Sequence, residues 1–344
     1  MVAIHQVREH NAALGAETPG LVALFTGATR GIGAATLHQL VRGLNTPTIY
    51  AVGRSATQFA DQRAELQSLN PRAQIKFIAA NIALLREVDR VCQLVAEAEE
   101  RLDLLFMSPG FIPVNGPDYT DEGIDKCMSL SYYGRIRFVS KLVPLLTRSR
   151  NPRVLSVLAG GAERHLEVND MELGKSYSML NAIDHMTSLQ TLAFIHMAPR
   201  YPRICFVHAH PGFVATDILS DAFATRWSGV FGLIARFFGW LFIVPFVKTF
   251  LAMSVEESGE RQAFHATSRR YVSAVARNTG GLEQRHPELE SANGVYLLGP
   301  KGELKANWRL LQRWIGQGYA DKVWDHTMAV FENVELRNRE PKSF

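Results

Sequence analysis

The sequence predicts a doubly wound α/β fold, in which helices cover both faces of a mostly parallel sheet. Three observations predict it. Short apolar runs recur along the chain, and longer stretches with the apolar spacing of helices lie between them. One apolar run leads through a glycine-rich turn directly into such a stretch. The 344 residues, 47% of them hydrophobic, suffice for one large core, so we expect a single domain.

The glycine-rich turn spans residues 26–33, after the apolar run 21–25 and before a helical pattern over 34–41. Glycines at this spacing allow a tight turn and let the backbone approach a pyrophosphate, which then meets free N–H groups at the start of the helix. Glycine also occurs in turns that bind nothing. We expect a Rossmann-type sheet with cofactor contacts at Gly27, Thr29, Arg30, Gly31, Ile32 and Gly33.

The second apolar run, 48–52, ends in Gly53-Arg54-Ser55. A site selective for NAD would place Asp or Glu at this corner, on the ribose 2′-hydroxyl, and the sequence has neither there. Arg54, helped by Arg30, is the type of residue that neutralises a 2′-phosphate. We therefore expect NADP(H) as the cofactor; two solvated surface arginines are the alternative.

The remaining elements are expected in a regular order. The predicted strands cover 74–80, 104–107, 153–158, 204–208 and 294–298. The predicted helices cover 1–18, a stretch whose apolar stripe is Val88, Val91, Cys92 and Val95, then 121–146 and 176–197, and two in the tail, marked by Trp308, Leu311, Trp314 and Ile315 and by Val323, Trp324 and Phe331.

The domain is expected to have a core over 20–216 and 292–300, a lid or insertion over 217–291, and C-terminal helices over 303–336. The phenylalanine-rich stretch 230–250 suggests the wall of a site for a small lipophilic substrate. Ordinary core, a contact in a homo-oligomer and shallow peripheral attachment to a membrane remain alternatives.

Composition excludes several classes of function. The net charge of +4 is spread out, with no basic run interleaved with aromatics, so nucleic acid is not an expected partner. Cys92, Cys127 and Cys205 lie far apart, which predicts free thiols and no metal site. We expect no secretory signal and no transmembrane span, because Arg236 and Pro245 interrupt the most apolar region, and hence a cytoplasmic protein.

The order of motifs resembles the short-chain dehydrogenase/reductase family: Thr-Gly-x-x-x-Gly-Ile-Gly at 26–33, Tyr177 in the middle, and Pro-Gly-x-x-x-Thr at 211–216. The resemblance covers roughly residues 20–216 and 294–299. The sequences of 104–110 and 157–161 are similar to those of a divergent branch of the family that is common in filamentous fungi, part of which serves secondary-metabolite pathways. The resemblance implies further cofactor contacts at Asn81, Ser108, Gly110, Pro211, Gly212, Val214 and Thr216.

The catalytic set departs from the family pattern. The family pairs Tyr-x-x-x-Lys with a Ser after the fifth strand and an Asn on the preceding helix, whereas this chain keeps Tyr177 and has Asn181, Ala159 and Ser131 at the other three positions. A neutral Asn181 cannot stabilise a tyrosinate, but on the same helix face as Tyr177 it would reach the nicotinamide ribose. The resemblance leaves Tyr177, Asn181 and Ser131 as the candidate catalytic residues.

Carbonyl reduction needs only a neutral tyrosine hydroxyl, so it tolerates these losses better than alcohol oxidation does. We expect an NADPH-dependent oxidoreductase that reduces a carbonyl or conjugated alkene of a lipophilic, secondary metabolite. Two alternatives stay open: a non-redox cyclase, isomerase or dehydratase in the same pocket, and a cofactor-binding protein without turnover.

Neighbouring polar residues are weaker candidates. Asp184 and His185 are expected at the far end of the tyrosine helix without a catalytic role, and Lys175 off the face of Asn181. The charged residues Glu163, Arg164 and His165 are expected in a solvated loop, although a reach into the pocket remains the alternative.

Overall fold

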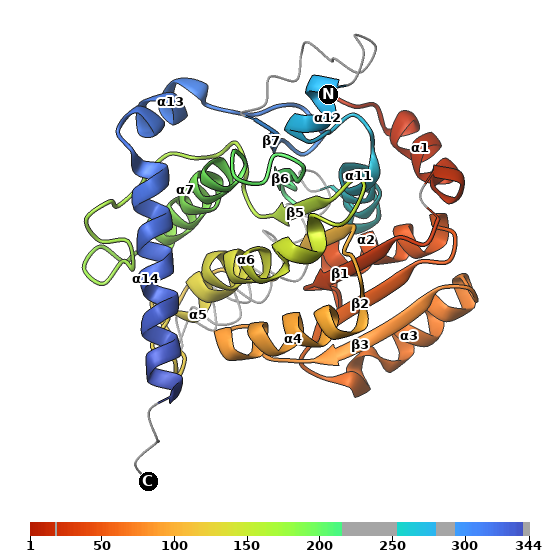
Figure 1. Ribbon diagram of the computed structural model, residues 1–344, viewed down its shortest axis with the longest axis horizontal. Helices are drawn as coiled ribbons and strands as arrows, with labels where there is room; N and C mark the ends of the chain where they lie inside the picture. The colour runs from red at the N-terminus through yellow and green to blue at the C-terminus, as the bar shows by residue number, and fades with distance from the viewer. Residues whose placement is uncertain (18, 215–252, 280–292, 340–344) are drawn as a thin grey trace, which may run out of the picture.

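Seven parallel strands form one sheet in the computed structural model (Figure 1), in the order β3-β2-β1-β4-β5-β6-β7. The order reverses between β1 and β4, so the carboxyl ends of these two strands form the switch point at which doubly wound sheets bind ligands. The predicted fold class is confirmed. The strands are β1 Val22–Thr26, β2 Thr48–Gly53, β3 Gln74–Ala79, β4 Leu104–Met107, β5 Arg153–Val157, β6 Cys205–Ala209 and β7 Val295–Leu298.

The structure describes residues 1–17, 19–214, 253–279 and 293–339. Thr216 and the phenylalanine-rich stretch 230–250 therefore lie outside the described residues. None of the helices within the described ranges is both long enough and apolar enough to cross a membrane.

One face of the sheet packs against α1 Ile4–Glu17, α2 Gly31–Gly43, α3 Ala56–Leu69 and α11 Val255–Thr267. Helix α11 lies within the interval expected as an insertion, yet it belongs to this layer. It approaches α2 closely, because a Cβ on Gly259 would stand 2.6 Å from the Cβ of Ala35. This part of the interval therefore covers the sheet.

The other face packs against α4 Leu85–Ala98, α6 Gly134–Leu146, α7 Met179–Met197 and α14 Tyr319–Arg339. The predicted stripe of α4 is buried in this core. Helix α14 runs alongside α7 (Figure 1), where Asp321 pairs with His196 at 2.7 Å. Thr327 of α14 also hydrogen-bonds Tyr132, which precedes α6, at 2.5 Å. The short helices α5 Lys126–Met128, α12 Ala274–Thr279 and α13 Trp308–Gly316 complete the described elements.

Two predicted helix starts are wrong. The segment expected as a helix from 121 begins at Lys126, where Asp125 caps it by accepting the N–H of Met128 at 2.9 Å, and it contains a π-helical turn, Ser129–Tyr133, before α6. Helix α7 begins at Met179 instead of 176, with Ser178 as its N-cap. Tyr177 therefore precedes the helix.

Candidate functional site

The glycine turn between β1 and α2 is shaped for close approach. Gly27 has a φ of +78°, and a Cβ there would stand 2.7 Å from the nitrogen of Pro109. A Cβ on Gly33 would lie 2.2 Å from the Gly27 carbonyl oxygen. Arg30 stands at the N-cap of α2, and its side chain, which carries only donors, cannot accept from the N–H groups there. The first N–H groups of α2 thus have no side-chain cap from this residue, which fits a bound pyrophosphate.

The end of β2 lies beside this turn. The Thr29 methyl would stand 2.7 Å from a Cβ on Gly53, so the two segments touch. Arg54 is exposed, and Ser55 caps α3 by accepting the N–H of Gln58. An exposed guanidinium at this corner, with no carboxylate in 53–55, fits a ribose that carries a 2′-phosphate.

Asn81, after β3, is exposed, and its Oδ1 accepts the N–H of Ala83 at 3.4 Å. After β6, the Gly212 N–H donates to His210 Nδ1 at 2.9 Å, and Val214 bridges to Met253. These segments, together with Pro211, stand at the carboxyl ends of their strands, where the resemblance expected cofactor contacts.

Ser108, Gly110 and Ser131 are brought together after β4. Ser108 Oγ donates to the Gly27 carbonyl at 3.3 Å and ties this loop to the glycine turn. Ser131 Oγ would lie 3.6 Å from a Cβ on Gly110 and is 4.0 Å from Cys127 Sγ. Ser131 lies within the π-helical turn, a distortion that is frequent at functional sites.

The Tyr177 hydroxyl is buried and has no hydrogen-bond partner among the described residues. Burial raises the pKa of Tyr177 above its usual value, and nearby Asp125, Cys127 and Tyr119 raise it further. The hydroxyl is therefore neutral at physiological pH. It can donate a proton or a hydrogen bond, but it cannot serve as a tyrosinate base.

Asn181 does not share a helix face with Tyr177, contrary to the expectation, because Tyr177 lies outside α7. The Asn181 amide donates to the Ser176 carbonyl at 2.7 Å and so holds the segment that contains Tyr177 in place. Ala159 offers only its backbone N–H, 3.4 Å from His208 Nε2.

Arg135 is a site residue that the sequence analysis missed. It is 2% exposed and donates to the oxygens of Leu130 at 3.1 Å, Ser156 Oγ at 2.7 Å, Val157 at 2.9 Å and Pro109 at 2.5 Å. Burial lowers the pKa of Arg135 to about 9. Its sequence position gives little signal, because α6 also carries Arg137 and Lys141; only the spacing of four residues from Ser131 points to Arg135.

Glu163 is 3% exposed, so the expectation of a solvated position for it is wrong. Its Oε1 accepts from the Thr191 hydroxyl at 2.6 Å and from the Gly161 N–H at 3.0 Å. His208 Nδ1 lies 2.8 Å from Thr191 Oγ1. Since the Thr191 proton goes to the carboxylate, His208 donates from Nδ1 and accepts the Ala159 N–H at Nε2. Burial lowers the pKa of His208 to about 3, so its ring is neutral.

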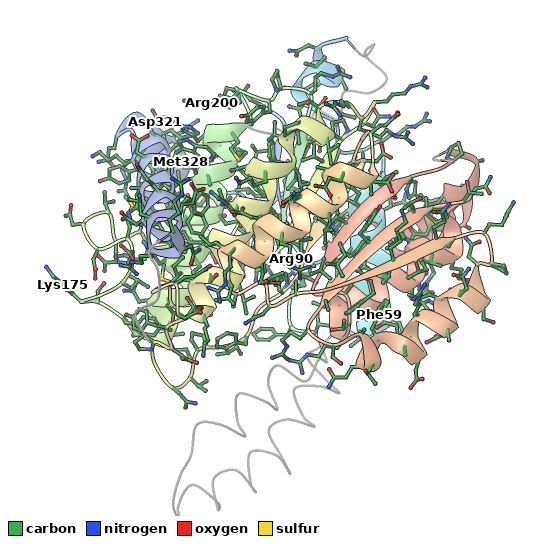
Figure 2. The ribbon with its side chains drawn as sticks, turned by 60° about the horizontal axis from the view of Figure 1, so that its bottom comes forward. Phe59, Arg90, Lys175, Arg200, Asp321 and Met328 are labelled. Atoms are coloured by element: carbon green, nitrogen blue, oxygen red, sulfur yellow. The ribbon has the colours of Figure 1, made fainter. Side chains whose placement is uncertain are left out.

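The other loop candidates lie apart from this cluster. Figure 2 shows Lys175 on an outlying loop, pointing away from the protein. Arg164 and His165 are exposed, and His165 pairs with Glu167 at 2.8 Å. His185 is fully buried and holds the loop through the Glu167 N–H and the Met171 carbonyl.

Several known proteins are similar to this chain. The family model for short chain dehydrogenase matches residues 21–171. Oxidoreductase lepF of Aspergillus flavus is 39% identical over 362 residues, covering 97% of this chain and 98% of the relative. Oxidoreductase AN1596 of Emericella nidulans is 36% identical over 343 residues, covering 98% and 100%.

Among solved structures, levodione reductase shares the fold with a TM-score of 0.55, at 18% identity over 72% of this chain and 91% of that one. The family model and the two curated relatives together span both the nucleotide-binding turn and the tyrosine region described above. The chain belongs to the short-chain dehydrogenase/reductase family.

Proposed function

We propose that the protein is an NADPH-dependent reductase of a carbonyl or conjugated alkene in a small lipophilic metabolite. The observation that carries the proposal is the glycine-lined start of α2 together with the neutral hydroxyl of Tyr177. The loop that contains Gly110 and the turn that contains Ser131 connect the two. When bound, NADPH supplies a hydride. A donor of that kind needs an acid beside it, which Tyr177 provides.

The chain's own residues divide the work. Gly27, Gly31 and Gly33 would admit the pyrophosphate, and the exposed Arg54 would neutralise the 2′-phosphate. Tyr177 donates its proton to the substrate and regains one from water. Asn181 holds the Tyr177 segment through Ser176, so we assign it a positioning role. The setting we propose is the cytosol, since all three thiols are free and buried.

A non-redox cyclase, isomerase or dehydratase is the second candidate. Two observations favour it: the pKa of Tyr177 is raised, and the Asn181 amide is already bound to the Ser176 carbonyl. Neither residue is then suited to the proton transfer that family members use for alcohol oxidation. A pocket of this kind would act by holding one conformation of a reactive intermediate.

Stereospecifically deuterated NADPH distinguishes the two candidates. The protein is incubated with a mixture of lipophilic enones and ketones, and the products are examined by mass spectrometry. Deuterium in a product, with at least about a 100-fold lower rate in Tyr177→Phe, is expected for the reductase because general acid catalysis contributes about 10²–10⁴. Substrate conversion without deuterium incorporation from either C4 position of NADPH, tested with the two stereospecific labels in turn, supports the second candidate.

A further inference from the structure

We propose that Arg135 and Ser131 form a niche beside Gly110 for one negatively charged oxygen of the substrate. The niche lies at the carboxyl end of β4, next to the loop that touches the glycine turn. The ligand class is a lipophilic molecule with an enolate or alkoxide oxygen. Only this identification of the ligand as substrate rests on the proposed function.

The guanidinium of Arg135 has a donor to spare. Arginine carries five N–H groups, and within the described residues four of those of Arg135 are used, toward Leu130, Ser156, Val157 and Pro109. The remaining N–H is on Nη2, the nitrogen that would stand 4.0 Å from a Cβ on Gly110. All four acceptors are neutral oxygens, so none of these partners neutralises the charge.

Gly110 leaves the space that a ligand atom needs. A Cβ there would meet Ser131 Oγ at 3.6 Å and Arg135 Nη2 at 4.0 Å, and nothing closer. The position is open to one atom, flanked by a hydroxyl donor and a guanidinium nitrogen. The Ser131 hydroxyl has only the distant thiol of Cys127, at 4.0 Å, as a described partner.

The described partners of Arg135 include no carboxylate, and a buried cation of this kind favours a bound anion. Removing a guanidinium from water is costly unless a negative charge compensates it, and a charged oxygen held by two donors does so in a medium of low dielectric. Negative charge that develops on a carbonyl oxygen during reduction is the charge this niche would stabilise. Isolated alkenes develop no such charge, so the niche selects carbonyl-bearing substrates.

Another buried arginine shows that an unused N–H does not by itself make an anion-binding niche. Arg153 donates to the carbonyls of His265, Ser268 and Tyr271, and its Nε has no partner among the described residues. It stands at the start of β5, at the opposite end of the sheet from the glycine turn. Arg153 ties α11 to the sheet and serves as the matched control.

The test uses 4-nitrophenol as the probe, because its phenolate carries one charged oxygen on a lipophilic ring and absorbs visible light. The full-length protein is saturated with NADP⁺, so no turnover is needed. Spectrophotometric titration gives the dissociation constant and the pKa of the bound phenol. We expect the phenolate to bind and its pKa to fall, and the neutral analogue 4-nitroanisole to bind at least about tenfold more weakly.

Three variants locate the binding. Gly110→Ala fills the niche with a methyl group at ordinary contact distances, so it should fold and lose at least about tenfold in phenolate affinity. Ser131→Ala should lose about threefold to tenfold, as expected for one hydroxyl donor. Arg135→Lys should abolish the pKa change of the probe, whereas Arg153→Lys should leave probe binding as in the parent.

The proposal is overturned if the parent binds phenolate and nitroanisole equally, or if Gly110→Ala binds phenolate as tightly as the parent. If Arg135→Lys does not fold, Gly110→Ala and Ser131→Ala still decide. Probe binding with no deuterium transfer to any substrate would reject the reductase and retain the niche, and the reverse result would retain the reductase alone.

Discussion

Replacing Gly33 with alanine would test where the dinucleotide binds. The new Cβ would stand 2.2 Å from the Gly27 oxygen and 2.6 Å from Ser108 Oγ, whereas ordinary contact begins at 3.4 Å. The start of α2 and the glycine turn must therefore separate by about 1 Å, at a cost of about 1–3 kcal/mol in stability. Losing two charge-assisted N–H bonds to phosphate, about 3 kcal/mol, lowers NADPH affinity by about 100-fold.

Fluorescence titration with NADPH measures that affinity, and thermal unfolding measures the stability of each variant. Gly20→Ala is the control, because Gly20 has a φ of +65° with no atom within 4 Å. This control should lose about 1–2 kcal/mol of stability and keep the parent affinity. An unchanged affinity in Gly33→Ala would show that the pyrophosphate does not lie at the start of α2, and the reasoning would be refuted.

Three further predictions concern the cofactor, pH and the C-terminal helix. Arg54→Ala should lower NADPH affinity at least about tenfold and leave NADH affinity unchanged in parallel titrations. Burial raises the pKa of the Glu163 carboxyl above its usual 4.5, so the folded state binds this proton more readily than the unfolded state does. The free energy of unfolding of the parent, relative to that of Glu163→Gln, should therefore decline as pH rises above about 4.5. The same pH dependence of both proteins in urea unfolding would contradict this. Phe331→Ala should cost about 3–5 kcal/mol in urea unfolding, because Phe331 is 3% exposed, while Leu336→Ala on the same helix, 52% exposed, should cost under about 0.5 kcal/mol.

Most strands could be predicted from the sequence because they are short apolar runs that the sheet buries on both faces, as in β1 and β4, whereas the edge strand β3 is only partly buried. Helix starts could not, because they depend on which polar side chain is free to cap. Both Ser176 and Ser178 precede α7, but Ser176 Oγ is bound to Asp170 at 2.8 Å, so Ser178 becomes the N-cap. Likewise Asp121 is held by Arg86 at 2.7 Å, and Asp125 caps the helix instead.

The glycine turn could also be predicted, because its residues are contiguous and the chemistry of the turn is local. The buried charges could not. Glu163 finds Thr191 across 28 positions, and Arg135 finds Ser156 and Pro109 across 21 and 26. A charge is placed inside only when partners of this kind exist, and a single sequence does not show them.

Buried side chains that bind backbone groups near the carboxyl ends of the strands make this site polar. Arg135 holds the Pro109 and Val157 carbonyls, His208 the Ala159 N–H, and Glu163 the Gly161 N–H. In the family pattern, a Ser at position 159 would polarise the substrate carbonyl and a Lys at position 181 would stabilise the tyrosinate. Here Ala159 and Asn181 do neither, so the backbone groups and the buried cation of Arg135 are what remains to act on the substrate. Such an arrangement stabilises charge that develops on a substrate oxygen, and it gives no help to a tyrosinate. The charge that the site can stabilise is therefore that of the substrate oxygen in the transition state, which the two directions of the reaction share.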